Sequence, residues 1–387
     1  MMKHLGIEVT ELEKNKGFWT TKEIEQQPDC WLKTLSIVNE CRAQAEAFLA
    51  PLFAKENLRI VMTGAGTSAF AGKALAPILA KELNCRVEAI ATTDIVSNPS
   101  QYFAEDIPTL LVSFARSGNS PESVHAVDLA TQVLSDCFHL VVTCNAEGQL
   151  YSRCQSDARS FAVLMPAETN DKSFAMTSSF SSMMMAAFSF LTFNKADAKD
   201  FEKVCEQSKK LIQDVCAPIR DIVAKDAKRV IYLGSGGFQG LAQESALKLL
   251  ELTAGKVVAM YDSPLGFRHG PKSIIDDETL IMVYISNDPY TRQYDLDLLT
   301  ELRRDNQALQ VVAVAAQLDD VVTDGHYLHI EGLEAASDVE LIFPYLVVAQ
   351  EYSLFHSLAL DITPDNPCPT GEVNRVVQGV IIHPFGS

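Results

Sequence analysis

The sequence lacks any close pair of cysteines and any long hydrophobic run. Its nine cysteines are an odd number and none forms a C-x-x-C pair, which argues against a zinc site and a disulfide framework and favours a reducing compartment. The longest apolar stretches, such as Leu341–Ala349, are too short to span a bilayer. The first ten residues have no apolar core of the signal-peptide type. We therefore expect a cytoplasmic protein without a membrane-spanning segment.

Positive charge is scarce in this chain. It has 32 Lys and Arg against 50 Asp and Glu, which gives a formal net charge of −18. Such an acidic surface repels nucleic acid and anionic lipid, so we expect neither as a partner. An anionic small molecule remains possible where a local pocket supplies basic side chains and backbone N–H groups. The length of 387 residues favours two domains of similar size.

Apolar segments recur along the chain at a constant offset of 170 residues, as from Thr109 to Thr279. In both halves the first of these segments ends in a glycine turn, Gly64–Gly66 and Gly234–Gly236. The paired segments are Leu58–Thr63 with Arg229–Leu233, Thr109–Phe114 with Thr279–Tyr284, and Val141–Val142 with Val311–Val312. The repeat indicates an internal duplication.

Each half is predicted to be an α/β domain. Near-continuous apolar runs are typical of buried parallel strands, and right-handed β-α-β crossovers then give a doubly wound parallel sheet flanked by helices, a flavodoxin-like sandwich. We expect helix from the N-terminus to about Phe53 and a helix over 196–209 that joins the halves. The predicted domains are residues 1–210 and 211–387.

The turn over residues 113–122 is the first candidate for binding chemistry. A buried strand ends there in a small, hydroxyl-rich turn, and a helix follows with Ser120 as its N-cap and Pro121 in its first turn. Such a turn aims backbone N–H groups and a helix N-terminus at one point, which favours phosphate. The hydroxyls of Ser117 and Ser120 and the guanidinium of Arg116 can add direct hydrogen bonds. An ordinary β–α turn with a capping serine is the alternative.

The corresponding turn of the second half, Ser286–Pro289, has lost this pattern. Its Asp288 would repel phosphate. We therefore expect the second half to keep the fold without the phosphate cradle.

A second glycine-rich turn, Gly64–Ser68, follows the first apolar segment. Its glycines allow the backbone to turn tightly and to approach a ligand. Ala69 occupies the third position of a G-x-G-x-x-G pattern, so a nicotinamide cofactor is not indicated. A turn that only packs strand against helix is the alternative.

Acidic and basic residues alternate on one face of the helix predicted over 243–252. Glu244, Lys248 and Glu251 are spaced by four and three positions, so they share a face. A solvated salt-bridge ladder is the alternative for such a face.

The segment after that helix favours chemistry, because Arg268 and Lys272 flank His269 in a loop that glycine and proline make rigid. His326 and His329 lie in a strand-like segment and are expected to be structural.

Together these motifs resemble the sugar isomerase (SIS) domain family. The chain is similar to the isomerase half of glucosamine-6-phosphate synthase, and more so to the galactosamine-6-phosphate deaminase/isomerase group, also called tagatose-6-phosphate ketose/aldose isomerases. The motifs that carry the resemblance are Lys22-Glu23-Ile24 with Gln27-Pro28, Gly64-Ala65-Gly66-Thr67-Ser68, Arg116-Ser117-Gly118-Asn119-Ser120, and Glu244…Lys248…Glu251 followed by His269-Gly270-Pro271.

The resemblance implies two tandem SIS domains and a role for each motif. Glu251 would move a proton between C1 and C2 of the sugar, His269 would assist ring opening, and Lys248 would stabilise charge at the sugar hydroxyls. The residues expected to bind substrate or its phosphate are Gly66, Thr67, Ser68, Arg116, Ser117, Gly118, Asn119, Ser120, Lys172, Glu244, Arg268 and Arg375. No metal and no cofactor is expected.

The departures from the synthase are informative. Ala115 and Arg116 replace a serine and a glutamine of its phosphate loop, and no glutaminase domain is expected. No lysine occurs after Lys272, so the functional lysine of the synthase tail is missing. The tail 365–375 looks like that of the galactosamine-6-phosphate group, and Arg375 is expected to supply the cation instead.

The resemblance therefore predicts the reaction of D-galactosamine 6-phosphate with water to give D-tagatose 6-phosphate and ammonia, as in N-acetylgalactosamine catabolism. The alternatives are a glucosamine-6-phosphate deaminase, an aldose–ketose isomerase of a neutral sugar phosphate, and a non-catalytic sugar-phosphate sensor. The absence of a basic region and the retention of Glu251 and His269 count against the sensor. The resemblance also implies a homo-oligomer, a dimer or a dimer of dimers, with sites at the subunit interface.

Overall fold

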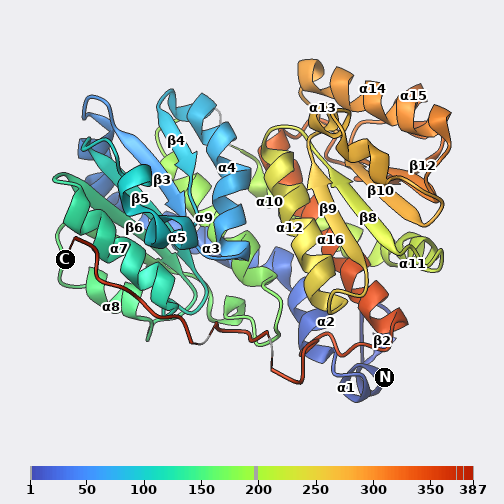
Figure 1. Ribbon diagram of the computed structural model, residues 1–387, viewed down its shortest axis with the longest axis horizontal. Helices are drawn as coiled ribbons and strands as arrows, with labels where there is room; N and C mark the ends of the chain where they lie inside the picture. Colours follow the sequence, from blue (N-terminus) through green and yellow to red (C-terminus); the bar gives the residue numbers. More distant parts are fainter. Residues whose placement is uncertain (1, 196–198, 372, 378, 387) are drawn as a thin grey trace. The chain divides into compact units, whose positions relative to one another are not determined.

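The computed structural model contains two five-stranded, all-parallel sheets (Figure 1). It describes residues 2–195, 199–371, 373–377 and 379–386. The first sheet has the order β4-β3-β5-β6-β7 and the second the order β12-β11-β10-β8-β9. The first sheet comprises β3 (Arg59–Thr63), β4 (Arg86–Ala89), β5 (Thr109–Ala115), β6 (Cys137–Thr143) and β7 (Ser160–Leu164). The second comprises β8 (Arg229–Leu233), β9 (Val258–Asp262), β10 (Thr279–Tyr284), β11 (Gln310–Ala315) and β12 (His326–His329).

The two sheets have the same topology, which confirms the predicted duplication of a doubly wound α/β fold. The predicted apolar pairs form the central strands β3 and β8, β5 and β10, and β6 and β11. Side chains of β5 and β10 are buried along their whole length, as expected for strands covered on both faces. The flanking strands β4, β7 and β9 are not among the predicted apolar pairs, whereas the strand-like segment with His326 and His329 is β12.

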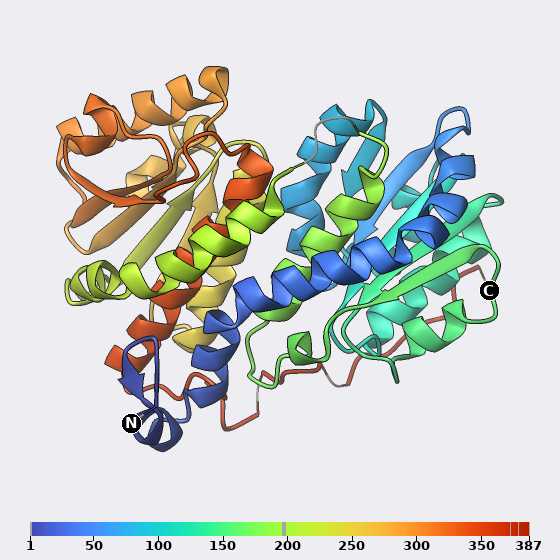
Figure 2. The ribbon, with the colours of Figure 1, turned by 180° about the vertical axis from the view of Figure 1, so that it is seen from behind.

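Helices cover both faces of the first sheet. Figure 2 shows α3 and α9 on the face opposite to the one that α7 and α8 cover in Figure 1. On the face that α7 covers, the core is formed by apolar side chains of β3, β5, α5 and α7, such as Ile95 and Leu129, together with Phe103. The helices are α3 (Gln27–Phe53), α4 (Thr67–Leu83), α5 (Thr92–Ser97), α6 (Pro99–Tyr102), α7 (Pro121–Val133), α8 (Gln149–Cys154) and α9 (Ser178–Leu191), with a 3₁₀ turn η1 (Ala167–Thr169).

The second sheet is covered in the same manner. Helix α16 packs against α10, α11 and α12, and the opposite face buries Phe267, Leu298 and Val322 against β10 and β11. The elements are α1 (Val9–Lys14), α2 (Phe18–Glu25), α10 (Phe201–Asp214), α11 (Cys216–Val223), α12 (Gly237–Leu252), α13 (Pro264–Phe267), α14 (Pro289–Asp305), α15 (Asp320–Thr323), α16 (Asp338–Ala359), a 3₁₀ turn η2 (Pro271–Ile274), and the hairpin β1 (Lys3–His4) and β2 (Ile7–Glu8).

The chain forms two compact units that are discontinuous in sequence. The first-sheet unit comprises the described residues within 29–171, 176–197 and 371–387, and the second-sheet unit those within 1–28, 172–175 and 198–370. Each unit thus combines segments from both sides of residue 210. The predicted domain boundary at this residue separates the two sequence repeats, and it stays a proposal. Of the helix predicted over 196–209, residues 196–198 lie outside the described residues, and α10 begins at Phe201.

No helix in the described part of the chain combines the length and the apolar character that crossing a membrane requires.

Candidate functional site

The two candidate loops of the first-sheet unit follow neighbouring strands at the point where the sheet order reverses. β3 pairs with β5 in parallel, from Arg59 opposite Thr109 to Thr63 opposite Ser113. β4 lies on one side of this pair, and β6 and β7 lie on the other. In open α/β sheets such a switch point forms a crevice at the carboxyl ends of the strands, where ligands bind. The fold thus brings the turn Gly64–Ser68 and the loop 116–120 to the same crevice.

The loop 116–120 presents several backbone N–H groups. Among the residues that the structure describes, no acceptor takes the N–H of Ser117, Gly118 or Ser120. Gly118 has φ +66, a conformation that glycine adopts without strain. Ser120 is the N-cap of α7 as predicted, but its hydroxyl donates to Ser123 Oγ at 2.6 Å rather than capping the helix. The loop therefore has the donors that an anion requires.

The turn Gly64–Ser68 brings a hydroxyl close to the same strand ends. A Cβ on Gly64 would lie 2.6 Å from Ser68, so only glycine lets the start of α4 pack so closely on β3. Gly66 has φ +55. The buried Ser68 hydroxyl makes only a weak contact, 3.8 Å from the sulfur of Met176. It is well suited to donate to a ligand instead.

The C-terminal tail contacts the loop 116–120 through two arginines. The buried Arg116 donates through Nη2 to the carbonyl oxygen of Arg375 at 2.9 Å. Arg375 in turn donates through Nε to the carbonyl of Asp171 at 3.0 Å, and through Nη2 to the same carbonyl. The guanidinium of Arg375, predicted to contact substrate, thus anchors the tail on the 170–171 segment. Residue 372 of this tail lies outside the described residues.

The acid–base–acid face of α12 is buried rather than solvated. Glu244 and Lys248 have no exposed side-chain surface, and 22% of the Glu251 side chain is exposed. Lys248 Nζ lies 3.5 Å from Glu244 Oε1 and forms a close ion pair with Glu251. A surface salt-bridge ladder is therefore the wrong interpretation. Placing these charges in the interior is costly unless they are paired, and such burial is typical of functional sites.

The loop that carries His269 lies on the opposite face of the second sheet from α12. The Ser263 hydroxyl accepts from Gly266 N at 3.1 Å and starts α13, while Phe267 is completely buried. Gly270 has φ +120, which favours glycine. His269 itself is exposed. Arg268, predicted to contact substrate, donates to Glu301.

The remaining predicted residue, Lys172, lies in a short segment tied to the N-terminal motif. Glu23 is buried and accepts from the backbone N–H groups of Lys172 at 2.5 Å and Ser173 at 3.2 Å, and from the Ser173 hydroxyl. The Lys172 ammonium lies 4.0 Å from the centre of the Trp19 ring. The motif Lys22-Glu23-Ile24 therefore holds segment 172–173 in place, a role that its sequence did not reveal.

The switch point of the second sheet contains carboxylates where the first contains free donors. Asp295 of α14 accepts from the Ser235 hydroxyl at 2.6 Å and from Ser286 N at 3.0 Å, so it bridges the loops after β8 and β10. Asp338 accepts from the Ser286 hydroxyl and from Asn287 N. Counted from the first proline of each helix, Val127 of α7 occupies the position of Asp295.

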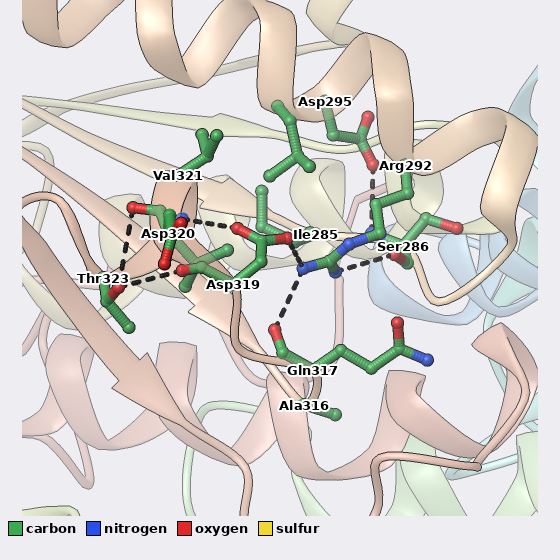
Figure 3. Close-up of polar contacts among 12 residues, drawn as sticks. Ile285, Ser286, Arg292, Asp295, Ala316, Gln317, Asp319, Asp320, Val321 and Thr323 are labelled. Atoms are coloured by element: carbon green, nitrogen blue, oxygen red, sulfur yellow. Dashed lines mark hydrogen bonds and ion pairs between the residues drawn. The ribbon is translucent and has the colours of Figure 1, made fainter.

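An arginine completes this second crevice. In Figure 3 the guanidinium of Arg292 points at Asp319 and at the carbonyl of Gln317, at 2.5 and 3.1 Å. It also donates to the carbonyl of Ser286 at 3.3 Å. Burial disfavours the charge of Asp319, but hydrogen bonds from Val322 N–H and Arg292 hold its pKa below the usual value. The loops of this crevice are thus linked by side chains of the protein.

Among the described residues, no group of three or more His, Cys, Asp or Glu side chains is arranged to bind a metal ion.

Known proteins resemble this chain over nearly its whole length. The SIS domain family matches residues 52–192 and 225–365. The chain is 51% identical over 372 residues to D-galactosamine-6-phosphate deaminase AgaS of Escherichia coli. This alignment covers 95% of this chain and 96% of that protein. It is 45% identical over 385 residues to the protein of the same name from Shewanella sp., covering 99% and 96% of the two chains.

A solved structure gives the same result. The crystal structure of tagatose-6-phosphate ketose/aldose isomerase from Escherichia coli superposes with a TM-score of 0.90 at 48% identity, over 96% of this chain and 98% of that one. The resemblance inferred from the motifs is confirmed. The chain belongs to the SIS domain family, with two copies of the domain, in the group of sugar-phosphate enzymes whose curated members are named D-galactosamine-6-phosphate deaminase AgaS.

Proposed function

We propose that this protein converts D-galactosamine 6-phosphate and water to D-tagatose 6-phosphate and ammonia. The observation that carries the chemistry is the buried pair of Lys248 and Glu251, of which Glu251 retains 22% exposure. A carboxylate that reaches solvent while a buried ammonium holds it can exchange a proton with a ligand. The substrate is proposed from the relative that is 51% identical over 95% of the chain.

The proposed reaction balances with one base. After ring opening, Glu251 takes the proton from C2 of the aldose, and the electron pair of that C–H bond forms the C1=C2 bond of an enaminol while the C1=O electron pair moves to O1, which takes up a proton from solvent. Glu251 then returns its proton to C1, and the nitrogen lone pair forms the C2=N bond of an iminium ion. Water adds to C2 and ammonia departs with the release of one proton to solvent, so that a ketone remains at C2. In this sequence Lys248 stabilises negative charge that develops at O1. His269, whose loop lies on the opposite face of the sheet from α12, transfers a proton during ring opening at the site of a second copy of the chain.

The phosphate is proposed to bind at the first switch point. The N–H groups of Ser117, Gly118 and Ser120, with the Ser68 hydroxyl, are donors suited to its oxygens. Arg116 adds a positive charge. Gly66, Thr67 and Asn119 form the surrounding backbone in this proposal, while Glu244 supports Lys248. Direct ligand contacts by Lys172, Arg268 and Arg375 stay predictions.

A plain aldose–ketose isomerase is the second candidate, because the solved structure at 48% identity carries that name. The same base would serve, without release of ammonia. Ammonia release from the purified protein with galactosamine 6-phosphate, glucosamine 6-phosphate and N-acetylgalactosamine 6-phosphate decides between them. We expect release from the first substrate only, and isomerisation without ammonia would overturn the proposal.

The variant Glu251→Gln distinguishes an enzyme from a sensor. We expect kcat to fall by about 10²–10⁴-fold, the usual contribution of a general base, while the affinity for sugar phosphate is retained. Glu278→Gln, an exposed carboxylate in the same unit, is the matched control. Full activity of Glu251→Gln would exclude this residue as the base.

We also propose a cytoplasmic homo-oligomer, a dimer or a dimer of dimers. His269 is exposed, and so are Val258, Tyr261 and Leu265 in the preceding segment, at 48%, 40% and 44%. A second copy that covers this patch would remove apolar surface from water. All nine cysteines are free thiols, which suits a reducing compartment. Light scattering after size-exclusion chromatography tests the oligomer, and a monomer at micromolar concentration would contradict it.

A further inference from the structure

We propose that Glu301 is a positioning residue that holds His269 in place for ring opening. This inference rests on the proposed function of His269. It concerns the His269 loop, which we define as residues 263–275, and its contact with α14.

One carboxylate holds both cations that flank the histidine. Glu301 Oε2 accepts from Arg268 Nε and lies 2.9 Å from both Nε and Nη2 of that guanidinium. Its other oxygen, Oε1, accepts from Lys272 Nζ at 2.5 Å, and the same ammonium also donates to Asp305 at the end of α14. Because Arg268 and Lys272 precede and follow His269 by one and three residues, the carboxylate fixes the chain on both sides of the ring.

Helix α14, which carries Glu301, also anchors the loop through an apolar contact. Phe267 is completely buried and packs in a cluster that includes Leu298 and Leu302 of α14. Glu301 and Leu302 follow Leu298 by three and four positions, so both are its neighbours on one face of the helix. The His269 loop therefore rests on α14 through an apolar contact at residue 267 and through the ion pairs at Glu301.

The loop needs this external support. Gly270 has φ +120, and a Cβ placed there would meet no atom within 4 Å, so no neighbouring side chain packs against this point. Its own backbone bonds are short-range, such as His269 N to Gly266 O at 2.9 Å. His269 is exposed, so the ion pairs of Arg268 with Glu301 and of Lys272 with Glu301 and Asp305 limit the movement of the chain on either side of it.

Stability and positioning can be separated at this site. The side chains of Arg268, Lys272 and Glu301 are 28%, 24% and 24% exposed. Partly exposed ion pairs contribute little to the free energy of unfolding. A misplaced reacting group, by contrast, costs far more in rate, up to about a hundredfold for a displacement of about 1 Å. The loss of Glu301 should therefore change kcat more than it changes the melting temperature.

The test is Glu301→Gln, with Asp297→Asn as the matched control. Asp297 is an exposed carboxylate one turn earlier on α14. We expect kcat for ammonia release to fall on the order of tenfold in Glu301→Gln and to stay within about twofold in the control. The Kd of the acyclic 2-amino-2-deoxygalactitol 6-phosphate, which needs no ring opening, should be unchanged in both. A weaker Kd or an unfolded protein would assign Glu301 a structural role only.

A double-mutant cycle with Lys272→Met keeps the proposal testable if Glu301→Gln folds poorly. Lys272→Met alone should lower kcat in the same direction, and the double variant should lose less than the product of the two effects. Multiplicative effects would overturn the proposed contact. His269→Asn separates the two proposals: if it loses activity while Glu301→Gln keeps full activity, only the positioning role fails. Full activity of His269→Asn would remove the function proposed for that histidine.

Discussion

Asp295 accepts a hydrogen bond from the Ser235 hydroxyl at 2.6 Å, and this contact closes the second switch point across 60 residues of sequence. Its other oxygen accepts from Ser286 N. In the second sheet a carboxylate of the protein thus lies between the loops after β8 and β10. The corresponding loops of the first sheet present hydrogen-bond donors instead. Burial raises the pKa of Asp295 to about 6, from the usual 3.8.

The variant Asp295→Asn should change how stability depends on pH. Because the folded pKa is raised, the neutral carboxyl gives its full stabilisation below about pH 4, and this is lost as the pH rises through about 6. Between pH 4 and 7 the wild-type chain should therefore lose about 3 kcal/mol relative to Asp295→Asn, at about 1.4 kcal/mol per pKa unit. Urea unfolding at several pH values measures this, and Asp297→Asn is the control. A constant difference at every pH would contradict it.

The closed second crevice predicts one sugar phosphate per chain. The N–H groups of Ser286 and Asn287 already have carboxylate acceptors, so a phosphate would have to displace charges of its own sign. Calorimetric titration with galactosamine 6-phosphate should give a stoichiometry of one per chain. Two equivalents per chain would show that the second crevice opens.

Removing two hydroxyls of the first loop should weaken phosphate binding. We expect the double variant Ser117→Ala and Ser120→Ala to raise KM by about 10²–10⁴-fold, since each of the two hydrogen bonds to a charged group contributes about 1.5–3 kcal/mol and each 1.4 kcal/mol is a factor of about ten. Ser286→Ala, at the corresponding loop of the second sheet, should leave KM unchanged. Kinetics with galactosamine 6-phosphate measure the effect. Equal KM values in all three proteins would place the phosphate elsewhere.

Glu23→Gln should destabilise the second-sheet unit. The buried carboxylate accepts from two backbone N–H groups and one hydroxyl of segment 172–173, and the amide can match only part of this. We expect a loss of about 2–3 kcal/mol in the free energy of unfolding. Lys22→Ala, which removes a cation near the Trp19 ring, should cost about 1 kcal/mol or less. Chemical denaturation compares the two, and equal losses would argue against the anchoring role of Glu23.

The sequence predicts the centre of each sheet better than its edges. β5 and β10 are apolar and buried along their length, which produces a readable run. The edge strands β4 and β9 are mostly half-exposed and include charged residues. Their strand form comes from pairing with β3 and β8, a tertiary contact that leaves little local pattern.

The same distinction applies to the candidate site. Motifs within a few residues, such as Glu244, Lys248 and Glu251, can be read because helical spacing brings them together. The contact of Arg268 with Glu301 joins residues 33 positions apart, and Arg268 alone gave no sign that its charge was already paired. The sequence therefore predicts a ligand contact for Arg268 without revealing its ion pair with Glu301, because that pair forms only in the folded chain.

The second-sheet unit also constrains the order in which the protein can fold during translation. Asp365 accepts from the backbone N–H of Trp19 and Thr20, which the ribosome adds about 345 residues earlier. Gln27 likewise donates to Gln350. At typical elongation rates the N-terminal helices spend on the order of tens of seconds without these partners. A nascent chain that stops before residue 350 would leave them unpaired, so this unit closes only when synthesis is nearly complete.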